Sequence, residues 1–379
     1  MSDFFIHSPD NTIITDATTQ ILKSHDAYQF HRSLPGYTPT PCLNLRWLAK
    51  KYHTGSIFIK DESKRFHLEA FKALGASYAV HRILQQYSHI DTLCTATDGN
   101  HGRALAWASA RAGKKSVVFV PHHTAPARIR AIEQEGGKAI KIEGNYDEAC
   151  DLAAEACRKD GWQLVQDAAR DGYEEIPALI MAGYLTQFRE LEPELHPPGK
   201  PDVDIAFLQA GVGSFAASAI WYYLDRYGPN RPKIILVEPF EADGVLASFR
   251  AGERVVPDKS FKTMMAGLNC GIPSPGAWNI IRSGTDAVVS ISDHFAAEAM
   301  QALYHPAGTD QPVTAGESGA AGLAGFMAVM EEEKLKPVRE LLRLSPESRV
   351  LFVNTEGATD PDNFRSITSK TTPPLRHNQ

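Results

Sequence analysis

Four short segments of the chain hold residues whose types and spacing could support chemistry. The first, AFKALGASYA, places Lys72 at the start of a predicted helix beside the small residues Ala73, Gly75 and Ala76. A lone lysine on a helix is usually a surface charge that keeps its ammonium group in water. Lys72 would take part in chemistry only beside a cofactor, so this segment is informative only together with the others.

The second segment, TATDGNHGRALAWA, leads from a predicted strand into a helix through Asp98, Asn100 and His101. Asp-Gly-Asn alone is typical of a turn, because Asp and Asn hydrogen-bond locally and tolerate unusual backbone angles. Here a carboxylate, a carboxamide and an imidazole come together at a helix N-terminus, where backbone N–H groups also point outward. We expect this loop to contact an anionic ligand.

The third segment, LQAGVGSFAAS, follows a strongly predicted strand, and its glycines allow backbone amides at a helix start to close on a phosphate. Gly211, Gly213 and Ala216 also satisfy the G-x-G-x-x-A dinucleotide fingerprint, and Glu238 ends the next strand. A nicotinamide cofactor would leave Lys72 and the TDGNHG loop without roles. A monophosphate cofactor joined to a lysine gives a role to all three segments and is therefore favoured.

The fourth segment, VNTEGATD, delivers Thr355 from the last predicted strand. Its hydroxyl could cap the following turn, or it could hydrogen-bond a ring nitrogen without forcing full protonation of that ring. Asp167 ends another predicted strand and is open to two interpretations as well. It suits the distal ammonium of a substrate, and it suits a capped turn equally well.

The elements that must position these segments are short β-branched runs that alternate with longer stretches of helical periodicity. This pattern predicts an α/β fold with open, mostly parallel sheets covered by helices. Ligands of such sheets collect beyond the carboxyl ends of the strands, where the last three segments begin. The predicted strands are 56–60, 93–97, 116–120, 138–143, 163–167, 204–210, 233–239 and 349–355.

Composition narrows the classes of protein that need to be considered. The 379 residues are 43% hydrophobic and 22% charged, which is sufficient for two domains with a substantial core. The formal net charge of -6 is spread without long runs, so no nucleic-acid partner is expected. The most apolar stretch, 207–224, is interrupted by polar residues and glycines, so no membrane span is expected. The N-terminus shows no secretory signal, which predicts a cytoplasmic protein.

The five cysteines form no C-x-x-C pair and are odd in number, which argues against both a disulfide framework and a zinc site. The histidines show no metal-ligand spacing either. The proline-rich segment 194–204 separates one series of strands and helices from the next. We therefore predict a larger cofactor-binding domain (1–80 and 190–379), a smaller α/β domain (81–189), an active site in the cleft between them and a disordered tail.

Taken together, AFK, TDGNHG, AGVGS, AGESGAAGL and VNTEG resemble, in order and spacing over nearly the whole chain, the tryptophan-synthase-β-like pyridoxal-phosphate enzymes of fold type II. Within that superfamily the chain particularly resembles the diaminopropionate ammonia-lyases, through GYTPTPCLNL, KDES, FKALG, TATDGNHGR, VQDAARDGY, VEP, MAGLNCG and NTEG. The superfamily's serine and threonine dehydratases usually carry serine in place of Asp98. Some members of the branch carry another cysteine after the VEP strand, which is missing here, so Cys270 has no obvious disulfide partner.

The resemblance implies a mechanism and a set of contacts. Lys72 would hold pyridoxal 5'-phosphate covalently and, once released by the substrate's amine, act as a base. Lys72 would remove the α-proton of L-2,3-diaminopropionate and Asp98 that of the D-isomer, while Asp167 would bind the distal ammonium. Elimination would give pyruvate and ammonia. The resemblance also suggests a homodimer with a small amino acid as substrate. The cofactor contacts would come from Phe71, Asn100, Ala210, Gly211, Val212, Gly213, Ser214, Glu317 and Thr355.

Several alternatives remain at this point. Phe71 suits the core equally well, and Glu317 suits the start of a helix, where the dipole favours a carboxylate. A serine or threonine dehydratase would use the same cofactor with a hydroxyl leaving group, although Asp98 and Asp167 suit a substrate with two positive charges. A non-catalytic pyridoxal-phosphate or ligand-binding protein on the same scaffold would not require Lys72 together with both acids.

Overall fold

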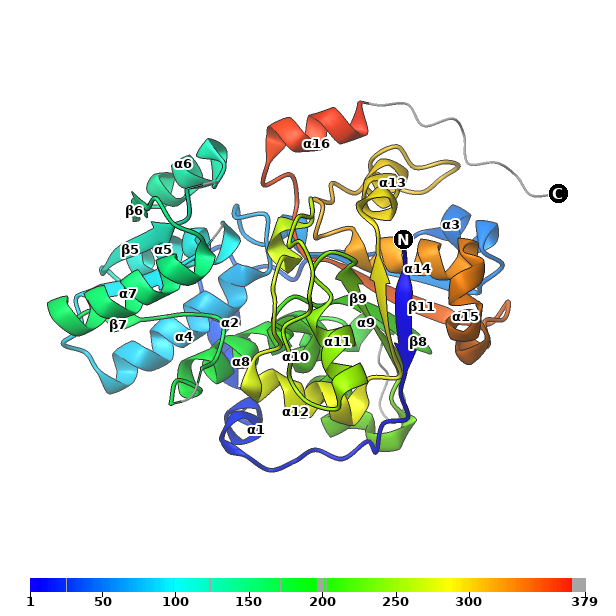
Figure 1. The fold of residues 1–379 in the computed structure, drawn as a ribbon, viewed down its shortest axis with the longest axis horizontal. Coiled ribbons are helices and arrows are strands. Elements are labelled where there is room, and N and C mark those ends of the chain that lie inside the picture. The colour runs from blue at the N-terminus through cyan, green and yellow to red at the C-terminus, as the bar shows by residue number, and fades with distance from the viewer. Residues whose placement is uncertain are drawn as a thin grey trace.

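The chain folds into two sheets of mostly parallel strands, each flanked by helices (Figure 1). A computed structural model describes residues 1–24, 26–97, 99–122, 124–170, 172–195, 201 and 203–369. Within this part of the chain the strands are β1 (Asp3–Ile6), β2 (Cys42–Asn44), β3 (Ser56–Asp61), β4 (Thr92–Ala96), β5 (Lys115–Val120), β6 (Lys138–Lys141), β7 (Gln163–Leu164), β8 (Ile205–Gln209), β9 (Lys233–Pro239), β10 (Ala287–Ile291) and β11 (Arg349–Asn354).

Most of the helices lie between consecutive strands, and α16 follows the last one. They are α1 (Ala17–Leu22), α2 (Asp26–Ser33), α3 (Arg46–Lys51), α4 (Lys72–Gln86), α5 (Asn100–Arg111), α6 (Pro126–Gln134), α7 (Tyr146–Asp160), α8 (Glu175–Arg189), α9 (Glu192–Leu195), α10 (Ser214–Tyr227), α11 (Gly244–Ala251), α12 (Pro275–Gly284), α13 (Asp293–Tyr304), α14 (Ala321–Glu331), α15 (Lys336–Leu342) and α16 (Pro361–Thr368). Short 3₁₀ turns occur at η1 (Glu62–Lys64), η2 (Gly228–Asn230), η3 (Ala266–Leu268) and η4 (Glu333–Leu335).

The predicted α/β fold class is confirmed, and each of the eight predicted strands is present. The main differences lie at β7, which ends at Leu164 instead of residue 167, and at three strands that were not predicted. Two of these, β1 and β2, are short antiparallel strands at the two edges of the larger sheet. The third, β10, is a buried parallel strand of sequence AVVSI beside β9.

Strand order explains how distant segments of the chain meet. The larger sheet has the order β1-β10-β9-β8-β11-β3-β2, and the smaller sheet has the order β6-β5-β4-β7. After β3 the chain leaves the larger sheet, builds the smaller one and returns at β8. The last strand, β11, lies between β8 and β3, so that Leu351 pairs with Ala206 on one side and with Phe58 on the other. The carboxyl ends of these three parallel strands therefore lie side by side.

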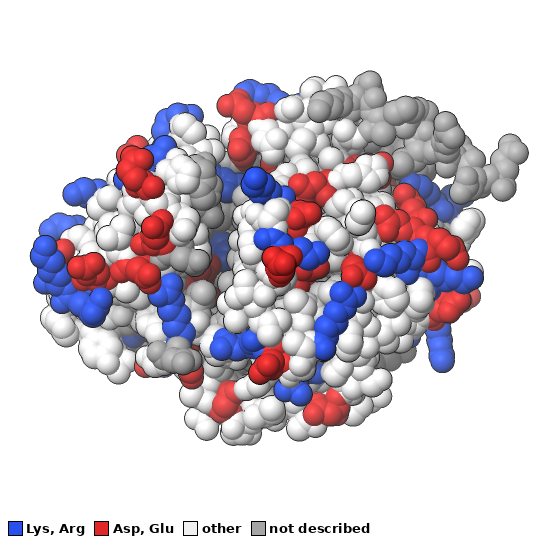
Figure 2. Space-filling view, viewed as in Figure 1, with Lys and Arg blue, Asp and Glu red and all other residues white. Residues whose placement is uncertain are grey.

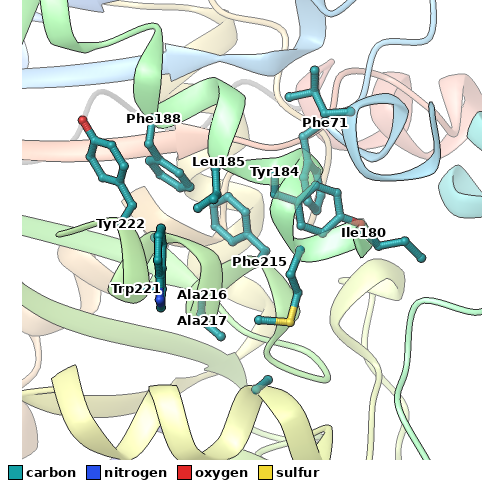
Figure 3. Packing of buried hydrophobic residues seen from close by; sticks show 14 of the residues in the cluster. Phe71, Ile180, Tyr184, Leu185, Phe188, Phe215, Ala216, Ala217, Trp221 and Tyr222 are labelled. Atoms are coloured by element: carbon teal, nitrogen blue, oxygen red, sulfur yellow. The ribbon is translucent and has the colours of Figure 1, made fainter. Parts of the chain in front are cut away.

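Helix α4, which begins with Lys72, is fixed by close packing against α8. A β-carbon on Gly183 would lie 2.4 Å from the carbonyl oxygen of Leu74, and one on Gly75 would lie 2.5 Å from the ring of Tyr184. The absence of side chains at these two positions lets the backbones approach closely. Figure 3 shows the aromatic side chains around this contact, where the ring centroids of Phe71 and Tyr184 are 4.6 Å apart.

A buried cluster of charged side chains joins the end of β3 to the end of α8. Lys60 Nζ lies 2.6 Å from Oε2 of Glu190, and Arg65 lies 2.7 Å from the same carboxylate and 2.8 Å from Glu62. All four side chains are at most 1% exposed. Because each charge has a partner of opposite sign, the cluster can stay buried, and it anchors the loop that leads to Lys72.

The exposed surface carries both signs of charge, which are interspersed over the face shown in Figure 2. Among the described residues, no helix is long and apolar enough to cross a membrane. None of the five cysteines is in a disulfide, and Cys94, Cys150 and Cys157 are buried. The predicted disordered tail lies outside the described residues.

Candidate active site

Lys72 and Asp167 form an ion pair in a cavity lined by loops that follow strands of both sheets. The Nζ of Lys72 donates to Oδ2 of Asp167 at 2.6 Å, and the two side chains are 22% and 14% exposed. Burial disfavours the charge on Lys72, but the carboxylate of Asp167 outweighs this and holds the pKa of Lys72 above its ordinary value. Burial likewise disfavours the carboxylate, yet Lys72 holds the pKa of Asp167 well below its ordinary range. The two residues thus stabilise each other's charged forms.

The glycine turn between β8 and α10 forms a second side of the cavity, through Gly211, Val212, Gly213 and Ser214. Gly213 has a φ of 92°, and no side chain of the described residues caps the start of α10 after it. The first backbone N–H groups of this helix therefore remain available for an anion. The Oγ of Ser214 donates to the backbone oxygen of Asp167 at 3.2 Å, which ties the turn to the ion pair.

The carboxamide of Asn100, the first residue of α5, donates from Nδ2 to Oε2 of Glu356. The other oxygen of Glu356 accepts the backbone N–H of Ser318 at 3.2 Å. Asn100, Ser318 and Glu356 all line the cavity. Glu356, in the loop after β11, therefore connects this part of the larger sheet to the start of α5, which follows β4 of the smaller sheet.

Thr355 follows β11 and is held by Gln209, the last residue of β8. The Nε2 of Gln209 donates to Oγ1 of Thr355 at 2.9 Å and to the backbone oxygens of Val353 and Ser318 at 3.0 Å. Because the hydroxyl oxygen of Thr355 accepts a hydrogen bond from Gln209, the hydroxyl hydrogen of Thr355 points away from Gln209. Both residues line the cavity. The role of Gln209 was not predicted from the sequence, because it depends on β8 and β11 being neighbours.

Not every predicted residue reaches the cavity. Phe71 lines it and also packs against Phe215, with ring centroids 5.1 Å apart, so the cavity and core interpretations of this residue both apply. Ala210 is buried behind the glycine turn, where its N–H donates to Val237 at 2.9 Å. Asp98 lies outside the described residues.

Glu317 is buried beside the cavity and is not among the residues that line it. Its Oε1 accepts from Nδ2 of Asn363 on α16. Burial, reinforced by the nearby carboxylate of Glu356, raises the pKa of Glu317 to about 7. In this structure Glu317 thus connects the loop before α14 to the C-terminal helix.

Several cavity residues were given no individual role from the sequence: His101 and Cys270 lie in the quoted motifs TATDGNHGR and MAGLNCG, whereas Arg128 and Tyr146 lie outside any. Tyr146 begins α7, and its hydroxyl accepts from Nε2 of Gln166 at 2.9 Å. No local motif marks Arg128 and Tyr146, because they reach the cavity only through the packing of loops that are far apart in sequence.

Glu238, which completed the dinucleotide fingerprint, has a different place in the structure. Its two carboxylate oxygens accept the backbone N–H groups of Val245 and Leu246, each at 2.8 Å. It is fully buried and caps the first turn of α11. This position gives Glu238 a structural role and removes the acidic residue that a ribose would need.

The residues of the cavity fit pyridoxal phosphate. Lys72 offers an amine for its aldehyde, and the turn before α10 offers a cradle for its phosphate. That cradle has little space for side chains, since a β-carbon on Gly211 would lie 3.1 Å from the Sγ of Cys270. Thr355 offers a neutral hydroxyl of the kind that suits a pyridine nitrogen. Among the described residues no cluster of His, Cys, Asp or Glu is arranged to hold a metal ion.

Comparison with known proteins gives the same picture. The family described as "Pyridoxal-phosphate dependent enzyme" matches residues 33–356. The diaminopropionate ammonia-lyase of Escherichia coli strain K12 is 36% identical over 378 residues, covering 94% of this chain and 95% of that protein. The crystal structure of the Escherichia coli enzyme with an aminoacrylate-PLP azomethine intermediate has a TM-score of 0.89 and 36% identity and covers 97% of both chains. Its complex with D-serine has a TM-score of 0.88 and 34% identity, over 97% of each chain.

The dehydratases of this superfamily are more distant. A biosynthetic L-threonine dehydratase of Salmonella typhimurium is 26% identical over 285 residues, which cover 75% of this chain and 51% of that protein.

Proposed function

Because the chain belongs to the family of pyridoxal-phosphate-dependent enzymes, we propose that it eliminates the β-amino group of 2,3-diaminopropionate and yields pyruvate and ammonia. Both nitrogen atoms of the substrate leave as ammonia, the second by hydrolysis of the enamine that elimination produces. The similarity to the Escherichia coli ammonia-lyase along almost the whole of both chains supports this choice of substrate.

The observation that carries the proposal is the carboxylate of Asp167 inside the cavity, 2.6 Å from the Nζ of Lys72. A buried carboxylate is costly unless a cation accompanies it. To act as a base for the α-proton, Lys72 must be a neutral amine, which leaves the carboxylate of Asp167 without its cation. The distal ammonium of the substrate can then take that place. Serine and threonine carry a neutral hydroxyl at that position, which cannot neutralise Asp167.

When bound, pyridoxal phosphate supplies a covalent link to the substrate's α-amine and an electron sink for the charge left on the α-carbon. Lys72 takes the α-proton of the L-isomer, and Asp98 takes that of the D-isomer. The distal amine is already an ammonium held by Asp167, so it departs as neutral ammonia with the electron pair of the broken bond. One site then serves both stereoisomers.

The remaining residues hold the cofactor in place. The turn from Gly211 to Ser214 binds the phosphate with backbone N–H groups at the start of α10, and Ala210, whose own N–H donates to Val237, supports this turn from behind. Asn100 would contact the ring hydroxyl and Thr355 would donate its hydrogen to the ring nitrogen, while Gln209 holds the threonine oxygen. Phe71 closes one side of the ring site. Glu317 does not line the cavity and acts indirectly, by accepting a hydrogen bond from Asn363 of α16.

The experiment that tests the proposal compares 2-oxo acid release by the purified holoenzyme from 2,3-diaminopropionate, L-serine and L-threonine. We expect fast pyruvate formation from diaminopropionate and little product from the hydroxy amino acids. The opposite preference would make the protein a dehydratase with the same cofactor. A yellow holoprotein that is inert toward all three would instead indicate a non-catalytic binding protein.

We also propose that the protein is a cytoplasmic homodimer. Each subunit would have a larger domain, formed by 1–80 together with 190–379, and a smaller domain, formed by 81–189. The five thiols, none of them in a disulfide, suit a reducing compartment. The division into domains is supported by β4, β5, β6 and β7, which together make the smaller sheet. Sedimentation equilibrium of the holoenzyme would test the dimer.

A further inference from the structure

His101 presents a buried ring nitrogen to the same cavity. The residue is 2% exposed, and its Nε2 lies 2.7 Å from the backbone oxygen of Val165. Its Nδ1 has no hydrogen-bond partner among the described residues and lies 4.0 Å from Oδ2 of Asp167. Both side chains line the cavity. A buried polar atom of this kind is uncommon in native proteins and calls for a partner that binds there.

The contact with Val165 determines where the imidazole carries its proton. A carbonyl oxygen can only accept, so Nε2 must be the donor. Burial lowers the pKa of His101 in spite of the neighbouring carboxylate, which leaves the ring neutral at physiological pH. In a neutral imidazole with a proton on Nε2, the other nitrogen carries a lone pair. Nδ1 is therefore an acceptor.

Nδ1 of His101 and the carboxylate of Asp167 are thus two acceptors that face each other at 4.0 Å with no proton between them. Lys72 satisfies the carboxylate in this structure but not the imidazole. A single group with several N–H bonds could satisfy both acceptors. An ammonium has three such hydrogens, whereas a hydroxyl has one and could satisfy only one acceptor.

We propose that Nδ1 of His101 is the second acceptor for the substrate's distal ammonium, and that it makes the site selective for an amine over a hydroxyl at the β-carbon. This inference rests on the proposed function and extends it. Asp167 balances the positive charge of the ammonium, and Nδ1 of His101 accepts a second hydrogen bond from it. An alcohol has only one O–H hydrogen and cannot donate to both acceptors. A hydroxy amino acid would leave one of the two buried acceptors unpaired, which costs binding energy.

Two substitutions of His101 distinguish the contribution of Nδ1 from that of Nε2. His101→Gln can place an amide nitrogen near the position of Nε2, so it can keep the bond to Val165 while removing the acceptor at Nδ1. His101→Asn can place an oxygen near the position of Nδ1, so it keeps an acceptor and loses the bond to Val165. The readout is the ratio of kcat/KM for diaminopropionate to that for L-serine. Where L-serine turns over too slowly, its competitive inhibition constant replaces its kcat/KM.

We expect His101→Gln to lower this ratio by about 10- to 100-fold, the effect of one hydrogen bond to a charged group, mainly through KM for diaminopropionate. His101→Asn should keep the ratio within about threefold of wild type, even where the protein is less stable. An unchanged ratio in His101→Gln would overturn the proposal. Equal losses for both substrates in both variants would also overturn it, because they would indicate a purely structural histidine.

A measurement independent of turnover accompanies the kinetics. In the ¹⁵N-histidine NMR spectrum of the holoenzyme, the resonances missing from His101→Gln identify His101. They should show a neutral ring with its proton on Nε2, and a proton on Nδ1 would refute the inference. Wild-type turnover of diaminopropionate tests the proposed function separately, so failure of the one is distinguishable from failure of the other.

Discussion

Replacing Gly213 with alanine should both destabilise the protein and weaken its hold on the cofactor. Gly213 has a φ of 92° at the start of α10, in the left-handed region. A β-carbon there would lie 2.5 Å from Cδ1 of Ile281 and 3.5 Å from Cβ of Ala277. Ile281 is completely buried, so its terminal methyl group cannot turn into solvent to make room. The new side chain therefore meets two separate penalties.

The two penalties can be sized. The left-handed backbone costs a residue other than glycine about 1–2 kcal/mol, and overpacking of a buried site costs about 1–3 kcal/mol. We expect Gly213→Ala to lower the free energy of unfolding by about 2–5 kcal/mol. Relief of the contact must move the turn, and loss of one hydrogen bond to a charged phosphate should weaken cofactor binding by about 10- to 100-fold.

Gly252→Ala is the matched control. Gly252 ends α11 with a φ of 77°, but a β-carbon there would have no heavy atom of the described residues within 4 Å apart from its chain neighbours. This variant should therefore show only the backbone penalty, about 1–2 kcal/mol, and bind the cofactor normally. Urea unfolding followed by tryptophan fluorescence measures stability, and absorbance titration of the cofactor-free protein measures affinity. Equal destabilisation by the two variants, or full cofactor affinity in Gly213→Ala, would refute the reasoning.

Three further predictions concern carboxylates. Asp98→Asn should sharply reduce turnover of D-diaminopropionate and spare the L-isomer; equal loss for both isomers in the pyruvate assay would contradict its assignment. Since the pKa of Glu317 is raised from 4.5 to about 7, the folded state holds this proton more tightly than the unfolded state, and stability should fall as pH rises between these values. Glu317→Gln should remove up to about 3 kcal/mol of this decline, measured by urea unfolding at pH 5 and pH 8; a parallel decline in the variant would exclude Glu317 as its source. Glu190→Gln should cost about 3–5 kcal/mol in the same assay at pH 7, because it leaves Lys60 and Arg65 buried with one carboxylate fewer, and a loss below 1 kcal/mol would show that the cluster tolerates the charge imbalance.

Much of the fold was predictable from the sequence, because buried parallel strands leave continuous apolar runs. β8 is buried at every position and reads as IAFLQ. The unpredicted strand β10, AVVSI, carries the same signal and could have been found. β1 and β2 could not, because strands of four and three residues at a sheet edge have too little periodicity to distinguish them from loops.

The candidate site was predictable where a single segment contains all the residues of a recognisable motif, as at Lys72 and the glycine turn. The ion pair between Lys72 and Asp167 joins residues 95 positions apart, and its distance follows only from the fold. The placement of Gln209 beside Thr355 likewise depends on β8 and β11 being neighbours, which no local pattern encodes. Glu317 illustrates the converse, since its motif is recognisable but its side chain points to α16.

The position of β11 between β8 and β3 has a consequence for how the protein is made. During synthesis the first 348 residues can form one partial sheet from β1, β10, β9 and β8 and another from β3 and β2, with unpaired edges facing the gap. Only when the last strand emerges from the ribosome can it pair with both edges and bring Thr355 to Gln209. The nascent chain therefore cannot complete its cofactor site early, and truncation before Arg349 should leave two open edges prone to aggregation.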